Sequence, residues 1–498
     1  MNVNPITRLD YPDPDVIRVE DTYYMVSTTM HFMPGCEILQ SFDLVHWEHV
    51  TYVYETLDHT DAQQLKSGQN IYGQGMWAAS LRYHEGRFYI CFVANDTRKT
   101  YLYTSEKIDG PWKKQLIEGF YHDGSLLFDE DGRNYIVYGN DEIWITELNE
   151  DLTAPKKDGL HRLLVSDHKN PKLGYEGSHI QKINGYYYIF LIHSLRDRWM
   201  RTEACFYSDS LEGEFTGGDV LCDDRGYCGQ GVAQGGIVDT PDGKWYAMLF
   251  QDSGAVGRIP ILLPVTWKDH FPVFGQNGHV PEEIEVHSTR PGYIYQPLVG
   301  SDDFCNGLLP RWQFNHDPDP QYYHLDALQG TYTITTREVC TELTQAVNTL
   351  TQRMSYPSCA AEVTVDASAL KEGDVAGLCA FQGCYAAVGI TKHHGKYEVL
   401  MLDKKEDGIL DMTEGTVVES HQMDFRLEAD FCNMKDEARC YYRVNKGDWL
   451  PIGTVHKLYF KLDHFTGCRF GLFCYAAEET GGSACFRDFK YYDVDEIS

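Results

Sequence analysis

A self-similar unit occurs five times within the first 290 residues, and this repeat constrains the fold more than any other feature of the chain. Each unit has an apolar strand, a turn rich in Gly, Asp or Asn, and a second strand that contains a tyrosine. The second strands read DTYYMVST, GRFYICFV, GRNYIVYG, GYYYIFLI and GKWYAMLF, centred on Tyr24, Tyr89, Tyr135, Tyr188 and Tyr246, at intervals of 65, 46, 53 and 58 residues. A hairpin with this spacing is typical of a four-stranded propeller blade, so we expect a five-bladed β-propeller over residues 1–300. A β-sandwich whose hairpins resemble each other by chance is the alternative.

The same alignment selects candidate catalytic residues. In a propeller the first strand of each blade lines the central channel, so equivalent positions meet around one axis. Eleven or twelve residues before the tyrosines stand Asp13, Ala78, Asp123, Glu176 and Gln234. Small residues follow most of these positions and leave the side chains exposed to the channel. Asp15 falls two places later, where the other blades carry serine or glycine, so we assign it to the strand.

Three converging carboxylates, from Asp13, Asp123 and Glu176, suit either calcium binding or acid–base chemistry on a neutral substrate. Calcium needs six to eight oxygen ligands, normally with a loop such as DxDxDG, which this sequence lacks. Glycoside hydrolysis needs one carboxylic acid that protonates the departing oxygen and one carboxylate that activates water from the opposite side. A third carboxylate keeps such an acid protonated by like-charge repulsion. The pattern favours a glycoside hydrolase, and acidic turn residues at strand starts are the structural alternative.

Composition limits the classes of partner. The 498 residues are too many for one core, so we expect at least two domains, and the 34 tyrosines and 9 tryptophans suit stacking on sugar rings. A net charge of −31 argues against nucleic acid and anionic membranes. The start MNVNPITRLDYPDP lacks the apolar core of a signal peptide, so we expect a cytoplasmic protein. The 15 cysteines include no CxxC pair, which favours reduced, buried thiols over disulfides or zinc.

Long motifs in a fixed order connect the propeller region with a known family. They are NPITRLDYPDPDVIRVEDTYYMVSTT, GMWAASL, HDGSLLFDEDGRNYIVYG, YEGSHIQKINGYYYIFL, GGIVDTPDGKWYAMLF and GRIPILLPVTWKDHFPV. From residue 4 to about residue 290 the sequence resembles glycoside hydrolase family 43, five-bladed propeller enzymes that act on xylan and arabinan side chains. The resemblance implies that Asp13 is the general base, Glu176 the general acid, and Asp123 the residue that orients and tunes the acid. It also implies inversion of the anomeric centre, with carboxyl groups about 6.5–9.5 Å apart.

Within the family, STTMHFMPGCEILQSFDLVHWE and the long C-terminal extension are most similar to β-xylosidases and α-L-arabinofuranosidases that carry an added β-sandwich. This resemblance implies that Phe32 and Trp77 wall the substrate pocket and that Arg258 contacts both substrate and base. Gln234 is a further candidate for substrate binding. It stands where many family members carry a histidine near a bound calcium, which speaks against that calcium. We therefore expect no required cofactor and assign no metal ligand, while a structural calcium stays open.

The fivefold pattern stops before the C-terminal third of the chain. Residues 301–498 contain short alternating segments such as GTYTITT, AAEVTVDA and YEVLML, which predict a β-sandwich. LLPRWQFNHDPDPQYYHL and GCRFGLFCYA resemble the concanavalin-like domain of those β-xylosidases. The short linker favours a domain docked on the propeller, where a loop would close one end of the channel, over a tethered carbohydrate-binding module.

The sequence as a whole predicts an all-β chain with a five-bladed propeller and a concanavalin-like β-sandwich. The predicted function is an inverting exo-glycosidase that releases terminal β-D-xylose, α-L-arabinofuranose or both from xylo- and arabino-oligosaccharides. The alternatives are another family 43 activity, of arabinanase or galactosidase type, and a non-catalytic sugar-binding propeller. We expect an oligosaccharide as partner and neither nucleic acid nor membrane, and homo-oligomer formation stays open.

Overall fold

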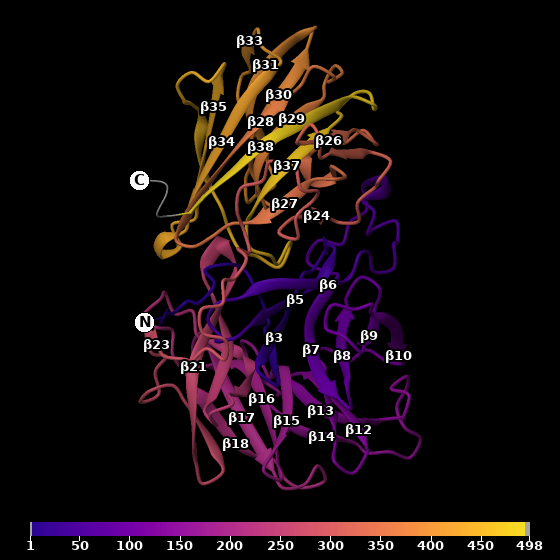
Figure 1. The fold of residues 1–498 in the computed structure, drawn as a ribbon, viewed down its shortest axis with the longest axis vertical. Helices are drawn as coiled ribbons and strands as arrows, with labels where there is room; N and C mark the ends of the chain where they lie inside the picture. Colours follow the sequence, from indigo (N-terminus) through magenta and orange to yellow (C-terminus); the bar gives the residue numbers. More distant parts are fainter. Residues whose placement is uncertain (1, 494–498) are drawn as a thin grey trace.

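The computed structural model describes residues 2–493, which form two β domains stacked along the long axis of the molecule (Figure 1). The N-terminal domain is a propeller of five four-stranded antiparallel sheets, and the C-terminal domain consists of two larger sheets packed face to face. The predictions of an all-β chain, a five-bladed propeller and a following β-sandwich are confirmed. No helix among the described residues is long and apolar enough to cross a membrane.

The five blades follow each other along the chain. Blade 1 contains β2 (Asp15–Val19), β3 (Thr22–Ser27), β5 (Gly35–Ser41) and β6 (Glu48–Tyr54). Blade 2 contains β7 (Met76–His84), β8 (Arg87–Ala94), β9 (Lys99–Ser105) and β10 (Lys113–Ile117). Blade 3 contains β11 (Ser125–Phe128), β12 (Asn134–Asn140), β13 (Glu142–Leu148) and β14 (His161–Ser166). Blade 4 contains β15 (Glu176–Ile183), β16 (Tyr186–Ser194), β17 (Arg201–Ser208) and β18 (Thr216–Leu221), and blade 5 contains β19 (Ala233–Asp239), β20 (Trp245–Asp252), β21 (Arg258–Lys268) and β22 (Phe271–Phe274).

The alternating apolar residues of these strands explain how the propeller closes. The repeated tyrosines all lie on the second strands β3, β8, β12, β16 and β20. The first strands lie next to each other around the axis in the order β2, β7, β11, β15, β19 and back to β2. Apolar side chains fill the space between neighbouring blades, including the space between blades 5 and 1, where Val16 and Met25 pack with Val238 and Met248. The first strands therefore form the wall of one central channel.

The sandwich consists of a nine-stranded and a seven-stranded sheet. The first contains β4 (Phe32–Met33), β24 (Gln313–Asn315), β27 (Leu350–Arg353), β29 (Val375–Phe381), β30 (Ala386–His393), β31 (Lys396–Lys404), β32 (Leu410–Met412), β33 (Thr416–Val418) and β37 (Arg469–Tyr475). The second contains β25 (Tyr323–Asp326), β26 (Thr331–Thr335), β28 (Ser358–Asp366), β34 (Gln422–Asp430), β35 (Glu437–Val444), β36 (Leu450–Lys457) and β38 (Ser483–Asp493). Short elements outside the blades and these sheets are the pair β1 (Asn2–Val3) and β23 (Glu283–Ile284), and the 3-10 turns η1 (Lys66–Gly68), η2 (Gly254–Val256), η3 (Leu343–Gln345) and η4 (Cys432–Met434).

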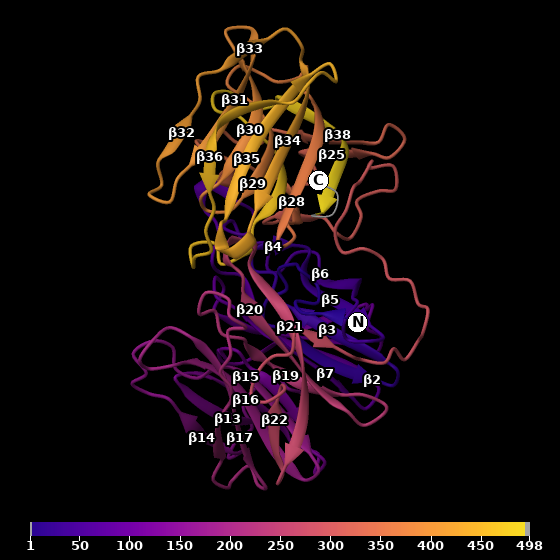
Figure 2. The ribbon, with the colours of Figure 1, turned by 90° about the vertical axis from the view of Figure 1, so that its left-hand side faces the viewer.

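A strand from the propeller and a buried ion pair join the two domains. β4 leaves blade 1 and pairs with β24 at the edge of the nine-stranded sheet. Arg353 of the sandwich lies 2.8 Å from Glu37 of blade 1, and both side chains are almost fully buried. The turned view shows the sandwich seated on one end of the propeller (Figure 2). The loop between β36 and β37, residues 458–468 and hereafter the closing loop, thereby reaches the mouth of the channel.

Candidate active site

A cavity of about 660 Å³ lies between the propeller and the sandwich. Residues from all five blades and from the closing loop line it. Of the seven residues selected from the sequence, six line this cavity: Asp13, Trp77, Asp123, Glu176, Gln234 and Arg258. The structure therefore brings together side chains that lie up to 245 residues apart in the chain.

A recurrent backbone feature directs side chains toward the axis. Asp13, Asp123 and Gln234 adopt left-handed backbone conformations with φ of 52°, 47° and 60°. Residues other than glycine adopt this conformation rarely, and it persists only where the surrounding structure enforces it. In blade 4 the left-handed residue is Gly177, with φ of 64°, and a Cβ there would come within 2.7 Å of Gln234 Cγ. A left-handed residue at or just before the start of these inner strands thus accompanies one polar side chain that faces the cavity.

Asp13 is held by two donors. Arg258 Nη1 donates to Asp13 Oδ1 at 2.6 Å, and Thr28 Oγ1 donates to Oδ2 at 2.7 Å. Arg258 also lies against Asp252, with Nε 3.3 Å from Oδ1, and Arg201 forms an ion pair with the same Asp252. A carboxylate that is fixed by a guanidinium and a hydroxyl is suited to accept a proton from a water molecule in a defined direction.

Asp123 and Glu176 flank one histidine. His122 Nε2 lies 3.5 Å from Asp123 Oδ2 and 3.4 Å from Glu176 Oε2. Asn140 Nδ2 donates to Glu176 Oε2 at 2.8 Å, and the backbone N–H of Gly177 donates to Asp123 Oδ2 at 2.9 Å. These contacts fix the orientation of the Glu176 carboxyl group at the cavity surface.

The charges around His122 alter its titration and that of Asp123. Burial alone would lower the pKa of His122, but Asp123 and Glu176 raise it to about 9. Burial, together with the negative charges of Glu176 and Asp13, raises the pKa of Asp123 to about 6 despite the opposing effect of His122. The cluster therefore carries a proton on His122 at neutral pH.

The donor atoms of His122, Asp123 and Glu176 lie within 4.8 Å of one another, a spacing that a metal ion could bridge. Calcium prefers six to eight oxygen ligands to this mixed set of three groups. A metal ion here would also have to displace the proton that the two carboxyl groups favour on His122 by raising its pKa. The three groups do not complete a calcium site, and we derive no step that uses a metal ion.

Gln234 lines the cavity and is almost fully buried. Its backbone N–H donates to Glu203 Oε2 at 2.7 Å. Glu203 is itself buried, and burial raises its pKa well above the ordinary value. The hydrogen bond from Gln234 to this buried carboxyl group fixes the backbone of Gln234.

The prediction that Phe32 walls the pocket is wrong. Phe32 is on β4, and the pairing of β4 with β24 places its ring within the sandwich, where it is fully buried. The Arg469 guanidinium lies 3.5 Å from the centre of that ring. Aromatic walls come instead from Trp77 and from Phe465 of the closing loop, whose ring centres are 5.7 Å apart.

Several residues of the cavity were not predicted from the sequence. They are His122, Asn140, Arg201, Asp252 and the closing-loop residues Phe460 and Phe465. Candidates were selected at the starts of the first strands only, whereas Asn140, Arg201 and Asp252 lie at the ends of second and third strands. His122 directly precedes Asp123, so its position in HDGS was the one available signal.

Each of the two domains matches the model of a known protein family. The model for glycosyl hydrolases family 43 matches residues 3–272, and the model for the beta xylosidase C-terminal concanavalin A-like domain matches residues 301–492. The predicted concanavalin-like character of the sandwich is thereby confirmed.

Three similar proteins cover between 82% and 99% of the chain. A beta-xylosidase of Formosa agariphila is 27% identical over 99% of this chain and 89% of its own length. A non-reducing end alpha-L-arabinofuranosidase of Bacteroides ovatus is 24% identical over 82% of this chain and 79% of its own length. A solved structure of a bifunctional GH43-CE protein of Bacteroides eggerthii superimposes with a TM-score of 0.92 at 42% identity over 99% of this chain. This chain spans 64% of the length of that bifunctional protein.

Proposed function

The chain belongs to glycosyl hydrolases family 43, and from this premise we propose that it is an inverting exo-glycosidase for short oligosaccharides. We propose terminal β-D-xylose, α-L-arabinofuranose or both as the sugars released. The observation that carries the proposal is the convergence of three carboxyl groups in one cavity that the closing loop covers. The xylosidase and arabinofuranosidase names of similar proteins support this choice of sugars.

In the proposed reaction Asp13 is the general base. Arg258 and Thr28 keep its carboxylate oriented through hydrogen bonds of 2.6 and 2.7 Å. Asp13 removes a proton from a water molecule as the water oxygen attacks the anomeric carbon. The new C–O bond forms on the face opposite the departing group, so the configuration inverts.

Glu176 is the proposed general acid. Its carboxyl group, oriented by Asn140, gives a proton to the glycosidic oxygen as the C–O bond breaks. Asp123 lines the same cavity and accepts the backbone N–H of Gly177. This hydrogen bond fixes the peptide group between Glu176 and Gly177. His122 bridges the two carboxyl groups and compensates their charge.

The closing loop supports exo action. Phe465 packs 5.7 Å from Trp77 and 4.4 Å from the Arg258 guanidinium, measured from ring centres. Trp77 and Arg258 belong to blades 2 and 5, which flank Asp13 of blade 1. A cavity blocked on the side of the base accepts one terminal sugar and excludes a continuing chain.

Release of sugar from aryl glycosides tests this proposal. Purified protein should hydrolyse an aryl β-D-xyloside, an aryl α-L-arabinofuranoside or both, and the ratio of kcat/KM values gives the sugar preference. Because the proposed reaction uses only side chains of the protein and water, a chelator should leave the rate unchanged. Absence of turnover on both glycosides would contradict the proposal, and binding without turnover would favour a sugar-binding propeller.

A further inference from the structure

Two loops of the propeller form the edge of the cavity above blade 4. One, residues 167–175, connects β14 to β15, and the other, residues 195–200, connects β16 to β17. We call them the rim loops. They line the cavity with Lys172, Leu173 and Trp199.

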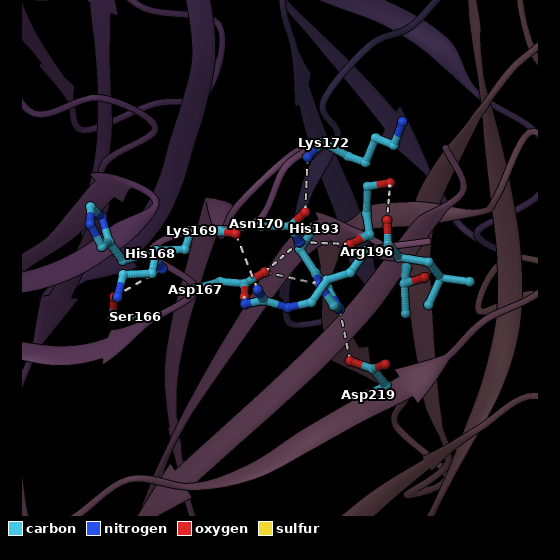
Figure 3. Close-up of polar contacts among 12 residues, drawn as sticks. Ser166, Asp167, His168, Lys169, Asn170, Lys172, His193, Arg196 and Asp219 are labelled. Carbon is cyan, nitrogen blue, oxygen red and sulfur yellow. Dashed lines mark hydrogen bonds and ion pairs between the residues drawn. The ribbon is translucent and has the colours of Figure 1, made fainter. Parts of the chain in front are cut away.

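The rim loops are tied to each other by hydrogen bonds and an ion pair around the buried Asp167 (Figure 3). Asn170 Nδ2 donates to Asp167 Oδ2 at 2.7 Å and to the carbonyl oxygen of Ser194 at 2.8 Å. Arg196 forms an ion pair with Asp167 and donates to the carbonyl oxygen of Lys169 at 3.2 Å. The loops are therefore preorganised and present their side chains in a fixed arrangement.

His193 and Lys172 complete this arrangement. His193 lies between two aspartates, 3.4 Å from Asp167 and 2.8 Å from Asp219. Asn170 Oδ1 accepts the backbone N–H of Lys172 at 3.0 Å, so the amide that ties the loops also fixes the backbone of Lys172. In Figure 3 the Lys172 side chain extends away from the network.

Lys172 differs from the other cations that line the cavity. Arg258, Arg201, His122 and Lys461 each lie against a carboxylate of the protein. Among the described residues Lys172 has no carboxylate partner. Trp199 stands on the neighbouring loop with 45% of its surface exposed, and the Arg201 guanidinium lies 5.4 Å from the centre of its ring. An unpaired ammonium group and an exposed indole ring together suit a sugar that carries a negative charge.

The position of the rim loops relative to Glu176 identifies the part of the substrate that they meet. Lys172 precedes Glu176 by four residues on the segment that leads into β15. The general acid protonates the oxygen of the leaving group, so the wall next to Glu176 faces the leaving group. Arg258 holds Asp13, and the Phe465 ring centre lies 4.4 Å from the Arg258 guanidinium, on the side of the base.

We propose that the rim loops form a leaving-group subsite for a carboxylate-bearing sugar, such as an oligosaccharide with a uronic acid branch. Lys172 pairs with the carboxylate, and the Trp199 ring stacks against a sugar ring. This inference rests on the proposed function, because it assigns the leaving group of that reaction.

A comparison of two trisaccharides tests the inference. Both end in the sugar released in the aryl glycoside assay, and one carries a glucuronic acid branch on the next residue. We expect the wild type to have a higher kcat/KM for the acidic trisaccharide and Lys172→Gln to lower the acidic-to-neutral ratio about fivefold. Lys169→Gln makes the same charge change on the same loop but outside the cavity lining, and it should leave the ratio as in the wild type.

The outcomes separate this inference from the proposed function. Hydrolysis of the neutral trisaccharide without preference for the acidic one would overturn the subsite and leave the glycosidase intact. Equal ratios for Lys172→Gln and Lys169→Gln would also overturn it. Failure to hydrolyse either trisaccharide or an aryl glycoside would overturn both proposals.

Discussion

Asp13 and Glu176 have different environments and different proposed roles. Variants of the two residues should therefore differ in how their activity depends on the leaving group of the substrate. Asp13 is bound by a guanidinium and a hydroxyl, and Glu176 by an amide and an imidazole. Asp13→Asn and Glu176→Gln should each lower kcat/KM about 10²- to 10⁴-fold on natural oligosaccharides. Glu176→Gln should recover most of its activity on a dinitrophenyl glycoside, whose leaving group needs no acid, and Asp13→Asn should not.

Asp15→Asn is a matched control for these variants. Asp15 lies two residues from Asp13, but its carboxylate binds Arg82, His179 and the backbone N–H of Leu81 inside the channel wall. This variant should lower stability while the folded enzyme keeps the leaving-group dependence of the wild type. Equal recovery of both active-site variants on the dinitrophenyl substrate would contradict the assigned roles.

His122 should make stability depend on pH. Its pKa is raised to about 9 in the folded protein, above the ordinary value of 6.5, so its contribution is full below pH 6.5. The contribution decreases as pH rises toward 9, by about 3 kcal/mol at most. We expect the difference in unfolding free energy between wild type and His122→Gln to shrink between pH 6 and pH 9. Denaturant titrations at several pH values measure it, and a constant difference would contradict this account.

The site residues that the sequence predicted stand at repeated positions of the chain, whereas those that it did not predict depend on contacts between distant strands. Asp13, Asp123 and Gln234 occupy the same place in the first, third and fifth repeats, so one alignment selected all three. Asp252 acts through Arg258 of its own blade and Arg201 of blade 4, and such ion pairs between strands have no pattern along the sequence. Phe32 was misplaced because its partner strand comes from 280 residues later in the chain.

At the scale of elements, the closing loop connects the sandwich with the chemistry of the propeller. Asp10 accepts the backbone N–H of Gly467 in this loop at 2.8 Å and that of Arg258 at 2.7 Å. One buried carboxyl group therefore fixes both the loop and the arginine that holds Asp13. The sequence predicted a loop at the rim, but its contacts depend on the docking of two domains and have no local signal.

Phe465 in this loop should contribute mainly to substrate binding. Phe465→Ala removes an aromatic wall next to Trp77, so we expect KM for a disaccharide to rise about tenfold while kcat changes less. Phe465→Tyr keeps the ring and should restore KM to within a few-fold of the wild type. Steady-state kinetics on a disaccharide measure both variants, and an unchanged KM in Phe465→Ala would exclude this role.

At the scale of the whole molecule, the buried pair of Glu37 and Arg353 should make the stability of each domain depend on the other. Burial alone would raise the pKa of Glu37, but Arg353 and His49 lower it to about 2. Glu37→Gln leaves the Arg353 charge buried and unpaired, which should cost about 3–5 kcal/mol of unfolding free energy.

The exposed pair of Asp21 and Arg290 provides the control for that variant. Both side chains are about half exposed, so Asp21→Asn should cost less than about 1 kcal/mol. Urea unfolding compares the two variants. Equal costs would show that the junction contributes no more than a surface contact does.

The order of the two domains and the closure of five blades follow from local repeats, which is why the sequence predicted them. The junction between the domains depends on β4, a two-residue strand that is too short to give a pattern. The shape of the cavity depends on this junction, because the closing loop belongs to the sandwich. The carboxyl groups could therefore be predicted, whereas the wall that faces them could not.

The stereochemistry of the first product tests the central claim most directly. Proton NMR during the first minutes of hydrolysis of an aryl β-D-xyloside, or of the arabinofuranoside if that is preferred, distinguishes the two anomers before mutarotation. With Asp13 as base and Glu176 as acid, the first sugar should have the inverted configuration, which is α-xylose from a β-xyloside. Initial accumulation of the retained anomer would mean that a carboxylate attacks the sugar directly, and the assignment of Asp13 as general base would be wrong.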